Sequence, residues 1–168
     1  IMSISPRVKH ATFIDKATGV MLQNHGEVLY SHGDRANEAL RMFACAKPVV
    51  AAVQGPAIGG GLGLALVADF RVTCPEARFS ANFTKLGFHP GFGLTTTLPE
   101  LVGKNNAELI FYTSRRVTGE EATKMGLANL CVPQDQVRAE AMKLAAEIAE
   151  CSPLGLLSTR ATMRAGLA

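Results

Sequence analysis

Three consecutive glycines at 59–61 are the residues of this sequence best suited to chemistry. A valine-rich apolar run at 49–53 precedes them, and a second apolar run at 62–68 follows. This order predicts a buried strand that turns sharply into a helix. The first amides of a helix have no partner within it and carry the positive end of its dipole, and glycine leaves them uncovered. Such a turn could hold an anion or a developing oxyanion at Gly60.

A purely structural interpretation fits the same glycines. Small residues permit tight packing of a helix on a strand, and the spacing alone leaves both interpretations open. Two nucleotide-binding motifs do not fit. No Gly-Lys-Ser/Thr follows the run, so it is not a phosphate loop. A dinucleotide fingerprint requires a third glycine where this chain has Leu64.

Strand and helix signals alternate along the chain, which predicts an α/β fold in one domain over 1–168. Thr118 and Glu121 have the spacing of a capping box, and Gly126 suits the end of the helix that follows. The expected strands are 10–14, 19–23, 49–53, 70–73, 78–80 and 127–132. The expected helices are 35–46, 62–68, 95–102, 107–113, 118–126 and 134–150, with a last one after Pro153, so that 134–168 is a C-terminal helical region.

The stretch 48–68 is almost free of polar residues and could be mistaken for a membrane helix. Its glycines at 55, 59 and 63 even have the spacing of packed membrane helices. Pro56 and the glycines would break a single helix, however, and Gln54-Gly55-Pro56 is typical of a turn. We therefore expect a strand, a turn and a short helix, and no membrane span.

Composition excludes several other classes. The net charge is only +3, aromatic residues make up 6%, and tryptophan is absent, which argues against a nucleic-acid binder. The four cysteines form no C-x-x-C pair, so neither a metal site nor a disulfide framework is indicated. Residues 1–16 lack the apolar core of a signal peptide. We expect free thiols and a cytoplasmic protein.

The glycine run lies in a longer stretch, KPVVAAVQGPAIGGG at 47–61, that is followed by Ala68-Asp69. This stretch closely resembles the crotonase superfamily, the enoyl-CoA hydratase/isomerase family. Further matches follow in order: GFHPGFG at 87–93, Leu-Pro at 98–99, Val-Gly at 102–103, TGEEA at 118–122 and Gly-Leu at 126–127. The resemblance covers 47–168 well and 17–34 weakly.

The resemblance implies a spiral of ββα units with C-terminal helices, assembled as a homotrimer or hexamer. It implies acyl-CoA thioester substrates, with coenzyme A as part of the substrate and no separate cofactor. The thioester oxygen would lie between two backbone amides, of which Gly60 matches the second. The first falls in LYSHGD at 29–34, at Ser31, or at His32 if the register slips by one. The segment after Asp34 and the N-terminal third are shorter than in the family, so we expect segments missing from this numbering.

Two departures from the family pattern bear on mechanism. Hydratases have glutamates at the positions that Gly63 and Phe83 occupy here. Hydration needs a base that activates water and an acid at the α-carbon, and neither residue can transfer a proton. The resemblance therefore implies the fold and CoA binding without the standard hydratase mechanism. We expect Gly63, Phe83 and Gly91 to line the substrate site.

Two other side chains are candidates for the missing chemistry. His89 lies in the loop where related dehalogenases and synthases have an acid, and an imidazole there could act as acid or base. The simpler interpretation is a loop histidine that is hydrogen-bonded to the backbone. His25 and His32 are weaker candidates for the same role. Lys85 belongs to a segment, 82–91, that resembles decarboxylating crotonase-fold enzymes, although a surface lysine is the simpler interpretation.

The first functional hypothesis is an acyl-CoA enzyme that stabilises a thioester enolate at Gly60. Isomerisation, hydration through a non-standard base and decarboxylation all pass through an enolate. Decarboxylation needs the least acid–base equipment, because loss of CO₂ itself generates the enolate. The alternative is a non-catalytic CoA-binding or scaffold subunit that kept the assembly and lost the chemistry.

Overall fold

A computed structural model describes residues 11–14, 21–23 and 45–165 of the chain, and gives no side-chain detail for the first two segments. The helix expected over 35–46 falls almost wholly outside these residues. The two N-terminal strands expected at 10–14 and 19–23 are present as β1 (Ala11–Ile14) and β2 (Met21–Gln23), paired antiparallel.

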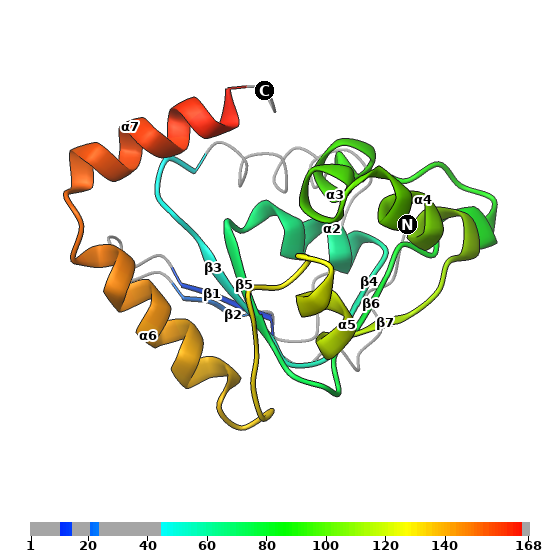
Figure 1. Ribbon diagram of the computed structural model, residues 1–168, viewed down its shortest axis with the longest axis horizontal. Helices are drawn as coiled ribbons and strands as arrows, with labels where there is room; N and C mark the ends of the chain where they lie inside the picture. Colours follow the sequence, from blue (N-terminus) through cyan, green and yellow to red (C-terminus); the bar gives the residue numbers. More distant parts are fainter. Residues whose placement is uncertain (1–10, 15–20, 24–44, 166–168) are drawn as a thin grey trace.

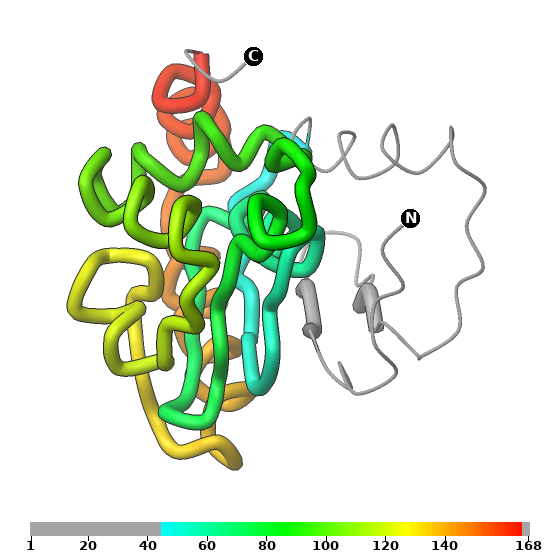
Figure 2. Tube along the Cα trace, turned by 90° about the vertical axis from the view of Figure 1, so that its right-hand side faces the viewer, coloured from blue at the N-terminus to red at the C-terminus, as the bar shows by residue number. Residues whose placement is uncertain are grey.

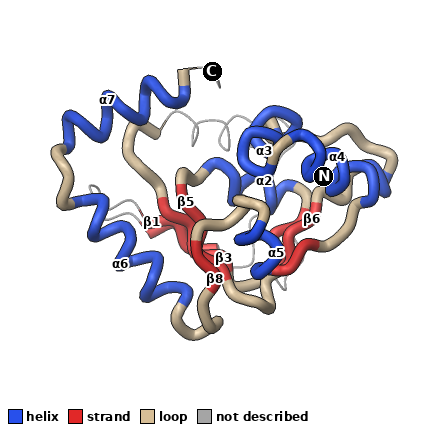
Figure 3. Tube along the Cα trace, in the orientation of Figure 1, coloured by secondary structure: helices blue, strands red, loops and turns tan. Residues whose placement is uncertain are grey.

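The described strands form two sheets (Figure 3). The larger has the order β2-β1-β3-β5-β8, where β3 is Val50–Val53, β5 is Phe70–Thr73 and β8 is Leu130–Cys131. β1 is antiparallel to β3, whereas β3, β5 and β8 are parallel. The smaller sheet has the order β4-β6-β7, formed by Pro56–Ile58, Arg78–Ser80 and Val117–Thr118.

The chain passes through these sheets in a repeated strand-strand-helix path. β3 lies in the larger sheet, β4 in the smaller, and α2 (Gly60–Val67) follows. β5 and β6 repeat the step and lead into a 3₁₀ turn, η1 (Thr84–Leu86), then α3 (Leu94–Val102) and α4 (Lys104–Thr113). Figure 2 shows the cyan and green strands of the two steps side by side. The α/β class is confirmed, and the path is that of ββα units.

Three helices complete the described chain: α5 (Gly119–Lys124), α6 (Val137–Ala149) and α7 (Pro153–Arg164). α6 lies along the larger sheet, and α7 follows it at the edge of the molecule (Figure 1). The predicted apolar face of α6 is confirmed. Val137 and Ala141 are buried, and three more side chains of that face are half-buried: Leu144, Ala145 and Ile148.

Two strands differ most from the expectation, whereas the helices differ from it only at their ends. β4 begins at Pro56, within the predicted turn. Proline has no amide hydrogen, but it is tolerated here because the first residue of a strand need not donate to its neighbour. The strand expected over 127–132 shrinks to two residues. The amides of Leu127 and Ala128 both donate to the Ala122 carbonyl, at 2.8 and 3.1 Å, and so close α5 instead.

Arg71, for which the sequence predicts no role, lies in the core. Arg71 on β5 is 2% exposed and donates to main-chain carbonyls of Leu127 and Ala68, both at 2.6 Å. Burial lowers the pKa of Arg71 to about 10, against the raising effect of the nearby Asp69 carboxylate. Its donors satisfy carbonyls at the ends of α2 and α5, so it ties both helices to β5.

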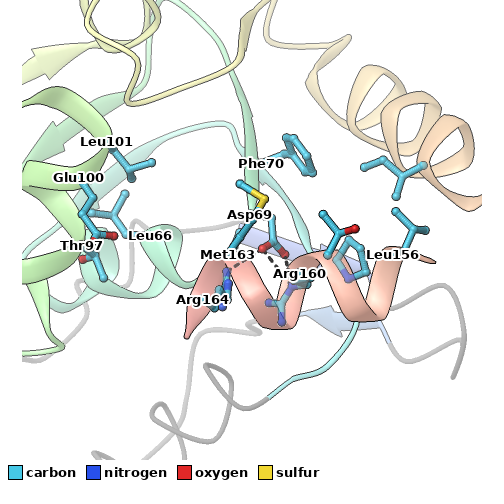
Figure 4. A pocket seen from close by; sticks show the side chains of 14 residues that line it. Leu66, Asp69, Phe70, Thr97, Glu100, Leu101, Leu156, Arg160, Met163 and Arg164 are labelled. Carbon is cyan, nitrogen blue, oxygen red and sulfur yellow. Dashed lines mark hydrogen bonds and ion pairs between the residues drawn. The ribbon is translucent and has the colours of Figure 1, made fainter. Parts of the chain in front are cut away.

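A second charged cluster holds α7 against the turn that precedes β5 (Figure 4). Asp69 forms ion pairs with Arg160 at 2.9 Å and Arg164 at 2.8 Å, and it also accepts a hydrogen bond from the Val49 amide at 2.7 Å. Arg164 reaches the Val67 carbonyl at 2.7 Å, and Arg160 donates to the carbonyl of Cys45. The Asp69 carboxylate thus joins α7 to the start of β3, and Arg164 links α7 to the end of α2.

The stretch 48–68 is divided among β3, β4 and α2. The strand and the helix agree with the expectation, whereas β4 follows the first strand where only a turn was expected. None of the helices in the described ranges has both the length and the apolar character needed to cross a membrane. All four cysteines are free thiols, and burial raises the pKa of Cys74, which disfavours its reactive thiolate form.

Candidate active site

The turn between β4 and α2 is shaped by Gly59. Ile58 pairs with Ser80 of β6, and the next residue, Gly59, donates its amide to the Ser80 carbonyl at 2.8 Å. Gly59 has φ 58° and ψ −118°, a conformation that residues with a Cβ adopt only under strain. Glycine at 59 therefore lets the strand end and α2 begin without an intervening loop.

Gly60 is the first residue of α2, and the amide of Gly63 donates to the Gly59 carbonyl at 3.1 Å to close the first turn. The amides before Gly63 consequently have no acceptor within the helix. The first turn of α2 has no acidic side chain that could accept hydrogen bonds from these amides. Gly60 is half-buried, so its amide lies in a position where a ligand oxygen can accept from it.

The two positions at which the resemblance leads one to expect glutamates, Gly63 and Phe83, are apolar here. Gly63 is buried one turn into α2. Phe83 lies three residues beyond Ser80, where β6 ends, and is 7% exposed within the hydrophobic core. Its carbonyl accepts from the amides of Leu86 and Phe88, at 3.0 and 2.9 Å, so it begins η1. Neither position offers a group that could transfer a proton.

Phe92, for which the sequence predicts no role, covers the glycine face of α2. A Cβ placed on Gly63 would lie 2.5 Å from the Phe92 Cβ, and one on Gly60 would lie 3.1 Å from its Cε2. Phe92 itself has φ 57°, in the left-handed region, and is followed by Gly93 with φ 64°. Glycines at i and i+3 are the signal that could have revealed a bulky partner, because they present a bare helix face.

The structure connects some predicted site residues and leaves others apart. The loop that contains His89 and Gly91 reaches α2 through Phe92, and so lies near Gly60 and Gly63. His89 is exposed, and so are Gly91 and Lys85. Ser31, with its alternative His32, and His25 lie outside the described residues, so the first oxyanion donor stays a prediction.

A cavity of about 370 Å³ opens at the other end of α2, between α2, α3 and α7 (Figure 4). Its walls include Leu66, Leu101 and Met163, together with the Asp69 cluster. α2 separates this cavity from Gly60 by its eight residues, about 10 Å at 1.5 Å per residue. The described residues contain no group of three or more His, Cys, Asp or Glu side chains that could hold a metal ion.

The sequence profile of the family described as "Enoyl-CoA hydratase/isomerase" matches residues 18–168. A crotonyl-CoA hydratase of Syntrophomonas wolfei is 38% identical over 124 residues, which are 74% of this chain and 48% of that protein. A probable enoyl-CoA hydratase of Mycobacterium tuberculosis, EchA14, is 44% identical over 126 residues, 75% of this chain and 48% of that protein.

Solved structures are similar over the same region. A probable enoyl-CoA hydratase/isomerase from Mycobacterium abscessus superposes with a TM-score of 0.74 at 34% identity, over 79% of this chain and 51% of that one. Pseudomonas aeruginosa DspI superposes with a TM-score of 0.72 at 30% identity, over 82% and 59%. The fold is therefore that of a crotonase-type protein.

The chain is a member of the enoyl-CoA hydratase/isomerase family. It spans about half the length of the curated relatives that it matches.

Proposed function

We propose that this chain contributes the oxyanion-binding half of an acyl-CoA thioester enzyme. The observation that carries the proposal is the turn at Gly59, which ends β4 and leaves the Gly60 amide at the start of α2 with no acceptor in the helix. An amide fixed in this way can donate to a thioester oxygen as negative charge develops on it. Relatives named as crotonyl-CoA and enoyl-CoA hydratases support the acyl-CoA class of substrate.

The reaction we propose is enolate formation by a route other than standard hydratase chemistry. Gly63 and Phe83 offer no base for water and no acid for the α-carbon. Decarboxylation of a malonyl-type thioester is the second candidate, because loss of CO₂ supplies the enolate without a base. The apolar side chains of Phe83 and Phe92 favour it, since an apolar wall does not stabilise a carboxylate that is about to leave.

The test deletes one donor. Purified protein is assayed against enoyl-, 3-hydroxyacyl- and malonyl-type thioesters, and Gly60→Pro is compared with wild type on any thioester that reacts. Proline is tolerated at the first position of a helix but has no amide hydrogen. Loss of one oxyanion donor lowers kcat about 10²- to 10³-fold.

Two variants separate the amide from packing. Gly60→Ala keeps the amide while placing its Cβ 3.1 Å from Phe92, and Gly61→Ala places a Cβ with no neighbour within 4 Å. Both should retain most of the activity that Gly60→Pro loses. Normal turnover by folded Gly60→Pro would refute the proposal. Thioester binding without turnover of any thioester would instead indicate the non-catalytic CoA-binding subunit.

We also propose a homotrimer or hexamer in the cytoplasm. Exposed apolar side chains on η1, the loop after it and α4 support self-association: Leu86, Phe88, Leu109 and Tyr112 are 54%, 64%, 41% and 74% exposed. Sedimentation equilibrium should give three or six chains per particle. A monomer at micromolar concentration would contradict this part of the proposal.

A further inference from the structure

Phe92 lies so close to α2 that it leaves no room for a side chain at Gly63. A Cβ added to Gly63 would lie only 2.5 Å from the Phe92 Cβ and 2.8 Å from its Cγ. Real Cβ atoms do not approach other atoms so closely, so a side chain at 63 and Phe92 exclude each other. The Phe92 side chain therefore occupies the volume beside the first turn of α2.

The same ring reaches the oxyanion position. Its Cε2 and Cζ would lie 3.1 and 3.6 Å from a Cβ on Gly60. In a helix the Cβ direction tilts toward the N-terminus, which is also where the free amide of Gly60 points. An acyl group whose thioester oxygen accepts from this amide thus has the phenyl ring beside its first carbons.

We infer that Phe92 is a specificity-determining residue, which restricts the acyl group at the α-carbon and selects linear over α-branched thioesters. This inference rests on the proposed function, because it requires the thioester oxygen at Gly60. Phe92 and Gly93 have left-handed backbones, with φ 57° and 64°, and this turn directs the Phe92 side chain onto the bare face of α2 at Gly60 and Gly63.

The test compares two saturated thioesters of equal carbon number, butyryl-CoA and isobutyryl-CoA, by titration calorimetry. Wild type should bind butyryl-CoA more tightly. Phe92→Ala should reduce this preference at least about tenfold. One carbon atom in an apolar pocket changes discrimination between substrates by about 10- to 200-fold. Phe92→Leu should reduce it less, and it keeps the measurement possible if the alanine variant is unstable. Phe88→Ala, in the same loop but 64% exposed, should leave the preference unchanged.

The outcomes distinguish failure of the inference about Phe92 from failure of the proposed function. An unchanged preference in both Phe92 variants overturns the inference while the proposed function stands. Failure of wild-type protein to bind any acyl-CoA, acetyl-CoA included, overturns the proposed function and this inference with it.

A second measurement tests the packing without any ligand. Gly63→Ala should lower the melting temperature, and Phe92→Gly in the same chain should restore it by removing the atom 2.5 Å away. Phe92→Ala should restore much less, because its Cβ remains. A Gly63→Ala variant as stable as wild type would show that Phe92 does not occupy this volume, and would overturn the inference.

Discussion

In the proposed site, Gly63 leaves the first turn of α2 without an acid or base. We predict that clean wild-type protein hydrates crotonyl-CoA slowly or not at all, at least about 10²-fold below a relative that has both glutamates. Loss of enoyl-thioester absorbance measures the rate. Gly63→Glu alone should not restore it, since the new side chain meets Phe92. Robust hydration by wild type would contradict our interpretation of Gly63 and Phe83.

His89 is the side chain that we propose for proton transfer. It lies between Phe88 and Pro90, three residues before the ring that reaches α2, and it is exposed. His89→Ala should lower kcat by about 10²-fold, the lower end for general acid–base catalysis, with KM nearly unchanged. His89→Gln, which keeps hydrogen bonding but cannot titrate, should be equally impaired. Full activity in either variant would make His89 a structural loop residue.

Among single residues, the glycine run predicted Gly60 as a donor, and the family resemblance predicted Gly63 and Phe83 in place of glutamates. These three roles stay predictions. Type and spacing did not identify Phe92 or Arg71. A phenylalanine in a glycine-rich loop and an arginine in an apolar strand have no local signature of their partners. Their contacts come from α2 and from the ends of α2 and α5, and only tertiary packing brings those elements together.

α5 begins at a capping box that the sequence predicted and the structure confirms. Thr118 Oγ1 accepts from the Glu121 amide at 3.2 Å, and Glu121 Oε2 accepts from the Thr118 amide at 2.7 Å. Hydrogen bonding to the carboxylate, first from the Thr118 amide and then from the Thr118 side chain, holds the pKa of Glu121 below its ordinary 4.5. A carboxylate whose pKa is lower in the folded state stabilises the fold at any pH above its pKa in the unfolded state. This contribution is lost as the pH falls through the pKa of the folded state.

The free energy of unfolding, followed from about pH 6 to about pH 3, should therefore fall less steeply in Glu121→Gln than in wild type. Glu120→Gln, one residue earlier and also exposed, is the matched control and should keep the wild-type slope. Thr118→Ala should cost about 1 kcal/mol at neutral pH. Identical pH profiles for wild type and Glu121→Gln would contradict the capping role.

Element types were easier to predict than element ends. Strand 70–73 and strand 78–80 match the structure in full, because polar or turn residues bound both. β4 was missed because its proline resembles a turn, and 127–132 was too long because α5 takes two of its amides. Boundaries of this kind depend on which partner an amide finds, which the local sequence does not specify.

For the molecule as a whole, Asp69 is the charge on which the docking of α7 depends. The side chains of Asp69, Arg160 and Arg164 are only 16%, 9% and 18% exposed. Asp69→Asn leaves two arginines without their counter-ion, and removal of one partner from such a buried group costs about 3 kcal/mol. Denaturant unfolding should show this loss, and hydrogen exchange should rise most in α7.

The exposed pair Lys104–Glu108 is the control for that experiment. Its side chains are 83% and 39% exposed, so Glu108→Gln should cost less than about 0.5 kcal/mol. If Asp69→Asn is as mild as Glu108→Gln, the ion pairs are not what holds α7. The sequence could not have indicated this anchor, because Asp69 and Arg160 are 91 residues apart.

The parallel pairing of β3, β5 and β8 has a consequence for the order in which the chain folds. β3 and β5 meet across a separation of 20 residues, whereas β8 joins β5 across 58. Closing the longer loop costs about 1 kcal/mol more in chain entropy, and β8 repays it with two residues. The nucleus of folding should therefore contain β3, α2 and β5, and the edge formed by β8 should be added late, after the rate-limiting step.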